Sequence, residues 1–285
     1  MAIHTGVMFI EPPPPPPRPY GLFDVALGPM AFPTPGAVGG GVQYMPDVCE
    51  DNVYLYDMTC PPVSGSKTFD SLETAVSGGP FAVLTSITCG SVGMTQAELE
   101  QRLRVRMALR EQRGVERRVW QGQTLGQGQG NIPGLFRNAT NVGPAGCVTE
   151  AVELLEQTLA NNGVVGGIIH ARVGMAAHFA QAHLVERPSP RRLQTPYGTP
   201  YVFGAGYDGS GPSGQAFDGD TEWVYASGRV VIWQDPEIFI SPMDQVFRQA
   251  SNEYIAVAER VHAVVVECGV WTVQVTRNCA TTGAT

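Results

Sequence analysis

The stretch Thr95–Val119, TQAELEQRLRVRMALREQRGVERRV, carries the strongest structural signal in the chain. It opens with a capping box, in which the Thr95 side chain caps the first turn and Glu98 reaches back to it. Apolar residues then recur at helical spacing, with no glycine or proline before Gly114. We predict a helix over 95–119, about 37 Å long. Its buried face would comprise Leu99, Leu103, Met107, Val115 and Val119.

The other face of this predicted helix is rich in arginine. Arg106, Arg110 and Arg113 are our candidates for contact with phosphate or with the carboxylates of a neighbouring subunit. The alternative is an ordinary solvated face, because exposed charges contribute little to folding. The sequence leaves both interpretations open.

The other regular segments mix helices and strands, which indicates an α+β protein. Residues 148–161 place apolar side chains on one face and end at Asn162-Gly163, the pattern of a second helix. A third helix is expected over about 172–184. Apolar, β-branched and aromatic residues predict strands at 164–169, 201–203 and 254–275, and a hairpin over 223–233.

The first part of the chain is predicted to be extended. The proline run Pro12–Pro17 favours a polyproline helix. We interpret residues 1–48 as an arm, a stiff spacer or a segment lying on a neighbour, with an SH3-type ligand as the alternative. Residues 54–86 have strand-like ends and a turn-rich tip, which predicts a long hairpin loop. The glycine- and glutamine-rich residues 122–134 are expected to form another loop.

Composition excludes several classes of function. The chain has 285 residues, a net charge of −8 and only 15% charged residues, so a broad basic surface for nucleic acid is not expected. No signal peptide or membrane span is predicted. The six cysteines form no C-x-x-C pair, and we expect them to be reduced. The low charge fits either a surface covered by identical neighbours or simply the base composition of a genome.

Short motifs that resemble functional signatures lack their context. Gly204–Gly209 matches G-x-G-x-x-G, but the following Ser210–Gly214 cannot propagate the helix that would bind a pyrophosphate. We therefore assign no catalytic, cofactor-binding or metal-binding residue. Two groups of potential metal ligands also match no known pattern: His170, His178 and His183, and Asp218, Asp220 and Glu222.

Three segments carry a resemblance to a known family. Thr195–Val202, TPYGTPYV, is followed by Gly206-Tyr207 and by Trp223–Val230, WVYASGRV. With the order of predicted elements around them, the chain resembles the major capsid proteins of tailed bacteriophages, which have the Hong Kong 97-type fold. The resemblance implies an N-terminal arm in 1–48, an extended hairpin loop in 49–92, a spine helix and the first part of a peripheral domain in 93–145, an axial domain in 146–240, and returning peripheral strands in 241–285.

The resemblance also implies a function and partners. It implies a non-enzymatic subunit without cofactors that forms hexamers and pentamers in an icosahedral shell. The shell would be assembled in the host cytoplasm and would enclose double-stranded DNA without sequence-specific binding or a membrane. Portal and scaffolding proteins, and in some relatives a cement protein, would be its partners. An encapsulin-like bacterial compartment of similar fold is the first alternative, and an enzyme of unknown type is the second.

Some relatives in this family crosslink a loop lysine to an asparagine of a neighbour. Lys67 is the only lysine here and falls at the predicted loop tip. Asn252 or Asn278 would be its partner, and a chance placement of Lys67 is the alternative.

Overall fold

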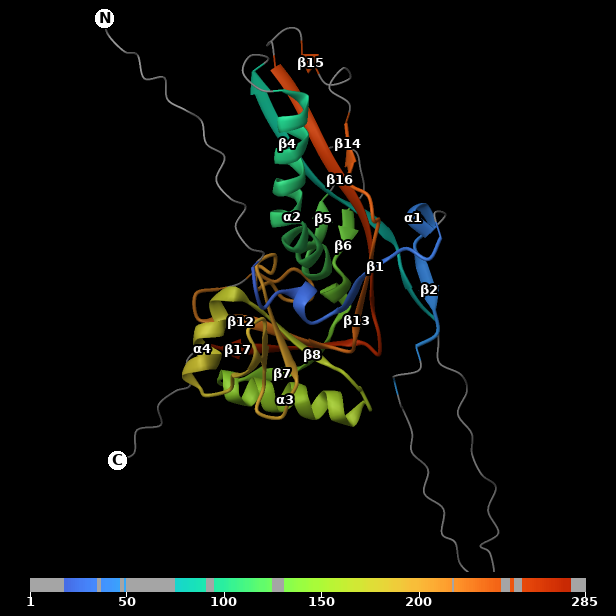
Figure 1. Ribbon diagram of the computed structural model, residues 1–285. Coiled ribbons are helices and arrows are strands. Elements are labelled where there is room, and N and C mark those ends of the chain that lie inside the picture. Colours follow the sequence, from blue (N-terminus) through green and yellow to red (C-terminus); the bar gives the residue numbers. More distant parts are fainter. Residues whose placement is uncertain are drawn as a thin grey trace, which may run out of the picture.

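The computed structural model describes residues 18–34, 37–46, 49, 75–90, 95–124, 131–216, 218–241, 247–248 and 253–277. Helix α2 (Gln96–Trp120) stands beside strands β4 (Pro80–Gly90) and β16 (Glu253–Val266), and a second sheet with helix α3 (Val148–Asn161) lies at one end of α2 (Figure 1). This confirms the predicted α+β class. Within these residues, no helix combines the length and apolar character needed to span a membrane.

The first sheet has six strands built around β16. Strand β4 pairs antiparallel with β16 from Gly90 opposite Glu253 to Pro80 opposite Ala263. The other side of β16 pairs in turn with three short strands, and β1 adds in parallel to one of them. These strands are β13 (Val230–Gln234), β14 (Phe239–Ile240), β15 (Phe247–Arg248) and β1 (Leu27–Ala31).

The second sheet has seven strands in the order β7-β17-β12-β8-β11-β10-β9. Helix α3 packs on β7, β17 and β12. The strands are β7 (Thr140–Ala145), β17 (Val270–Thr276), β12 (Thr221–Ser227), β8 (Ile168–Arg172), β11 (Pro200–Gly204), β10 (Arg192–Gln194) and β9 (Glu186–Ser189). The smaller elements are β2 (Val42–Tyr44) with β3 (Val76–Gly78), β5 (Gly122–Thr124) with β6 (Asn131–Pro133), α1 (Ala37–Gly40), α4 (Ala176–Gln181), η1 (Leu22–Asp24), η2 (Leu135–Asn138) and η3 (Val173–Met175).

Helix α2 forms as predicted. The Glu98 N–H donates to the Thr95 hydroxyl, and the Thr95 N–H donates to the Glu98 carboxylate, which completes the capping box. The predicted apolar face packs against β4 and β16. The five predicted core residues are all buried: Leu99, Leu103, Met107, Val115 and Val119.

The central strands β8, β11 and β12 of the seven-stranded sheet are buried on both faces, whereas the edge strand β9 is exposed. Along β12, Val224 and Ala226 belong to the core beneath α3, whereas Trp223 and Tyr225 belong to the core around the end of α2. The Trp120 and Tyr225 rings lie 4.5 Å apart, centre to centre. Burial on both faces explains why these central strands are mostly apolar instead of alternating with polar residues.

The predicted hairpin over 223–233 is wrong. Both strands exist, but β12 pairs within the seven-stranded sheet and β13 within the six-stranded sheet. The chain passes from one sheet to the other through residues 227–229, where an added Cβ at Gly228 would collide with the Glu267 carbonyl oxygen, so the close approach requires glycine. Strands β16 and β17, predicted within one strand region over 254–275, also belong to different sheets.

Three other local predictions need correction. The third helix is short: β8 runs on to Arg172, and α4 covers only Ala176–Gln181. The strand expected at 164–169 begins at Ile168, because Val165 is exposed. The expected loop over 122–134 has paired ends, since β5 and β6 form a ladder.

Part of the segment predicted as an arm (1–48) packs against the body, and the bounds of the arm remain a prediction. Leu22 is fully buried in the core beside α2. Strand β1 lies at a sheet edge, a position that accommodates Pro29 because an edge residue needs no partner for its missing N–H. Residues 1–17 lie outside the described residues.

Candidate functional site

The three arginines predicted to contact other subunits lie on α2 in different surroundings. Arg106 is half-buried, and its Nη1 donates to the Ser86 carbonyl of β4 at 2.7 Å. Arg110 and Arg113 are exposed and make no ion pair within the part of the chain that the structure describes. Arg106 therefore contacts its own subunit, whereas Arg110 and Arg113 are available to a neighbour. Lys67, Asn252 and Asn278 lie outside the described residues, so the crosslink remains a prediction.

A hollow of about 710 Å³ lies between β4, the end of α2 and the turn at 208–214. Among the described residues, Arg117, Arg118 and Arg137 line it together with one acidic residue, Asp208. Burial lowers the pKa of Arg118, whose guanidinium lies over the Phe81 ring. Asp208 accepts hydrogen bonds from Gln121 and Ser210, so it is held in a structural role. The hollow therefore offers positive charge to an acidic segment.

Several glutamates are buried, which the sequence patterns did not predict. Each makes compensating contacts, as a charge away from water requires. Four glutamates of the described residues are buried in this way: Glu111 with Arg260, Glu116 with backbone N–H groups, Glu222 with Arg172 and Arg277, and Glu267 with Arg229. Glu222 therefore does not belong to a cation loop with Asp218 and Asp220.

Glu116 holds three segments together. Its Oε1 accepts the Leu22 N–H at 3.0 Å, and its Oε2 accepts the Gly206 N–H at 2.9 Å. Burial raises the pKa of Glu116, and these hydrogen bonds oppose that rise. A Cβ on Gly206 would lie 2.7 Å from the Arg117 nitrogen. The glycine motif at 204–209 thus allows a turn to pack against α2, and no helix follows it.

His170 is a satisfied core histidine, as its lack of a metal-binding pattern indicated. Its Nδ1 lies 3.0 Å from the Tyr207 hydroxyl and its Nε2 lies 2.8 Å from Ser227 Oγ. Burial lowers the pKa of His170 to about 3, so the ring is neutral at physiological pH. Within the described residues, no group of three or more histidine, cysteine or acidic side chains is placed to hold a metal ion.

The two crossings between the sheets meet at one place, which we call the junction (residues 227–229 and 267–269). The Glu267 N–H donates to the Arg229 carbonyl at 3.0 Å, and the Gly228 N–H donates to the Gly269 carbonyl at 3.2 Å. Arg229 Nε and Nη2 donate to the two oxygens of the buried Glu267 carboxylate at 2.7 and 3.0 Å. The junction is therefore held by both backbone and charge.

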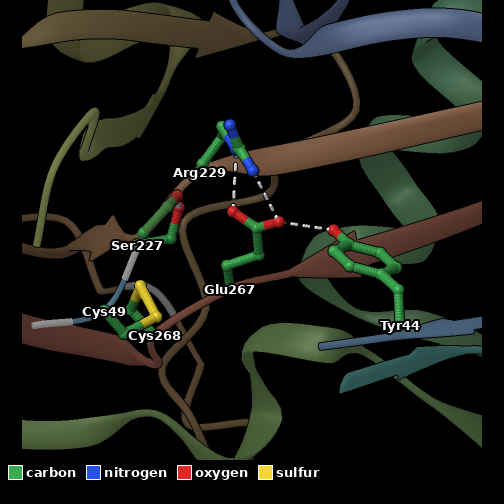
Figure 2. Close-up of a disulfide and its surroundings, with 7 residues drawn as sticks. Tyr44, Cys49, Ser227, Arg229, Glu267 and Cys268 are labelled. Carbon is green, nitrogen blue, oxygen red and sulfur yellow. Dashed lines mark hydrogen bonds and ion pairs between the residues drawn. A yellow bond between two sulfur atoms is a disulfide. The ribbon is translucent and has the colours of Figure 1, made fainter. Parts of the chain in front are cut away.

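The segment that leads toward the predicted hairpin loop is attached to the same place. Figure 2 shows the Tyr44 hydroxyl pointing at the Glu267 carboxylate, with the disulfide on the next residue along the chain. The Tyr44 O–H donates to Glu267 Oε1 at 2.6 Å, and burial together with Glu267 raises the pKa of Tyr44. The junction therefore connects both sheets and the segment that leads toward the predicted hairpin loop.

A disulfide joins Cys49 to Cys268, which lie 219 positions apart in sequence and have their Cα atoms 5.3 Å apart. This overturns the expectation of reduced cysteines for this pair. The spacing of the cysteines carried no signal, because residues so far apart are brought together only by the completed fold. Cys147 takes no part in the disulfide.

Comparison with known proteins places this geometry among phage capsids. No protein-family model and no curated protein matches the sequence. Among solved structures, the capsid of an empty GTA particle matches with a TM-score of 0.57 and 11% identity over 95% of each chain. The capsid of Ralstonia phage GP4 matches with a TM-score of 0.51 and 10% identity, over 99% of this chain and 98% of the other. A chain from Mycobacterium phage Adephagia matches with a TM-score of 0.52 and 12% identity, over 90% of this chain and 91% of the other.

The protein thus has the fold of tailed-phage capsid proteins, as the sequence resemblance predicted. The similarity extends over almost the full length of both chains, so it includes both sheets and α2. At these low identities, it defines the fold and assigns no role to any single residue.

Proposed function

We propose that this protein is the major capsid protein of a tailed bacteriophage, with the Hong Kong 97-type arrangement, and that it assembles into an icosahedral shell around double-stranded DNA. The end-to-end similarity to capsid structures carries this proposal. In this arrangement α2 is the spine helix and the segment between β2 and β3 is the extended loop. The protein is then a structural component of the virion and not an enzyme.

The two domains of the subunit would correspond to the two sheets, and each domain would combine separate ranges of the sequence. The seven-stranded sheet with α3 and α4 would form the axial domain, so β17 joins residues 140–227. The six-stranded sheet with α2 would form the peripheral domain, so β13 and β14 belong there. The proposed boundary near residue 240 therefore moves to the junction.

Assembly would use the surfaces that one subunit leaves unpaired. The exposed Arg110 and Arg113 and the arginine-lined hollow are positive in a protein whose net charge is −8. Acidic segments of neighbouring subunits are suitable partners for them. Hexamers and pentamers would form in the host cytoplasm with portal and scaffolding proteins, with or without a cement protein. The negative net charge keeps contact with the DNA non-specific and weak.

Particle size is the test of this proposal. Negative-stain images and light scattering of the purified protein should show shells or capsomers, whereas a small discrete oligomer would contradict the proposal. Shells that protect DNA from nuclease during infection support a phage capsid, and shells that hold an enzyme cargo support the encapsulin-like alternative. A variant lacking residues 61–70 should fold but fail to form shells. Normal shells from this variant would show that the loop is not needed for assembly.

A further inference from the structure

The segment 44–49 is attached to the junction at both of its ends. Tyr44 hydrogen-bonds to Glu267, and Cys49 is bonded to the next residue, Cys268. Cys49 also forms an isolated β-bridge with Val164, in the connection between α3 and β8. One covalent bond therefore fixes this segment against the six-stranded sheet and the seven-stranded sheet together.

The two attachments differ in their chemistry. The Tyr44–Glu267 hydrogen bond does not depend on redox conditions, whereas a disulfide is broken and remade by exchange with thiols. Cys49 and Cys268 are only half-buried, so the disulfide lies outside the fully buried core. The attachment at Cys49 is therefore the one that the surroundings can control.

We propose that the Cys49–Cys268 bond is a redox-controlled lock, open during assembly and closed after the protein leaves a reducing compartment. The proposal rests on the proposed function, because a capsid subunit is made in reducing cytoplasm and then acts outside the cell. In the open state, the hydrogen bond of Tyr44 to Glu267 remains and Cys49 is released from Cys268. In the closed state, Cys49 is held beside Cys268.

The closing reaction needs an oxidant, and a small disulfide such as oxidised glutathione supplies it. One cysteine thiolate attacks this disulfide, forms a mixed disulfide and releases one thiolate. The second cysteine thiolate then attacks the bonded protein sulfur and releases the second thiolate. Two protein thiols lose two protons and two electrons, and one small disulfide becomes two thiols.

Thiol labelling tests whether the lock closes in this way. The full-length protein is expressed in bacterial cytoplasm, lysed into iodoacetamide and examined by peptide mass spectrometry, before and after treatment with oxidised glutathione. We expect labelling of Cys49 and Cys268 to fall at least tenfold on oxidation. Equal labelling before and after oxidation, or a bond already complete in the cytoplasm, would overturn the proposal. Labelling does not require shells, so it remains informative if the proposed function fails.

Hydrogen exchange and dissociation test what the lock does. Oxidation should slow exchange at residues 42–46 and 164–165 severalfold in the wild type, but not in Cys49→Ser, and α2 should be unchanged in both. Oxidised wild-type shells should withstand more denaturant than reduced ones, whereas Cys49→Ser shells should not respond to oxidation. Shells that form normally but resist denaturant equally in both redox states would show that the bond is no lock.

Discussion

The Glu116 carboxylate accepts the backbone N–H of Leu22, a residue 94 positions earlier in the chain. This contact joins the N-terminal segment to α2, and Leu22 is buried in the same core that α2 covers. The same carboxylate also holds Gly206. A single side chain thus joins three distant segments.

Replacing Glu116 with alanine should lower the free energy of unfolding by about 2–6 kcal/mol, because the buried Leu22 N–H and the part-buried Gly206 N–H lose their acceptor at about 1–3 kcal/mol each. Denaturant titration of the soluble subunit measures the loss. Glu153→Ala, an exposed glutamate on α3, is the control and should change stability by about 0.5 kcal/mol or less. Equal effects would show that the Glu116 contacts contribute nothing.

Truncation of the buried face of α2 should be costly. Leu103→Ala should lower the free energy of unfolding by about 2–5 kcal/mol, since a cavity adds to the lost burial. Leu109, on the same helix, is 38% exposed, so Leu109→Ala is a matched control with a much smaller expected loss. An unchanged melting temperature for Leu103→Ala would contradict the packing of α2 on the sheet.

The turn at Gly206 should reject any side chain. Gly206→Ala places a Cβ against the backbone of α2 and should cost about 1–3 kcal/mol through overpacking. Gly219 has no heavy atom near its would-be Cβ, so Gly219→Ala should leave stability almost unchanged. Thermal unfolding of both variants makes the comparison, and identical curves would refute the close approach.

His170 should make stability depend on pH. Its pKa is about 3 in the folded protein and near 6.5 when exposed, so the unfolded state gains a proton first as the pH falls. Stability from this group is complete above pH 6.5 and should fall by about 2 kcal/mol on reaching pH 5. His170→Gln should remove that part of the pH dependence, while His178→Gln should retain it. Parallel pH profiles for all three proteins would contradict the assignment.

The exposed arginines of α2 should matter for assembly and not for folding. Arg110→Ala with Arg113→Ala should leave subunit melting unchanged but reduce shell yield at low salt, and the yield should then depend less on salt than in the wild type. The double lysine variant should recover most of the yield because it keeps the charge. Unchanged yield at every salt concentration would favour the solvated-face interpretation.

Local sequence patterns predicted the two long helices, α2 and α3, well, but they predicted poorly which strands pair with each other. The helix over 148–161 was predicted at its observed bounds, because its periodicity and its Asn-Gly end lie within a few residues of sequence. The strands around Gly228 look like a hairpin by the same local criteria. Instead, β12 pairs with β17 and β13 pairs with β16, and both partners lie far along the chain.

The junction could not have been predicted from sequence. Arg229 and Glu267 lie 38 residues apart, and Tyr44 lies 223 residues from Glu267, so no spacing connects them. Glu116 has no local feature that separates it from exposed glutamates of the same helix, since the residues that contact its carboxylate, Leu22 and Gly206, lie far away in sequence. The exposed Arg110 and Arg113, by contrast, lie where helical periodicity placed them.

The position of β17 has a consequence for how the protein is made. Strand β17 lies between β7 and β12, so the edge strand β7 has no neighbour in the seven-stranded sheet until residues 270–276 have left the ribosome. A chain that stops before β17 therefore cannot attach β7 to this sheet, even though the other six strands are already synthesised. Completion of the sheet thus waits for a strand near the C-terminal end of the chain.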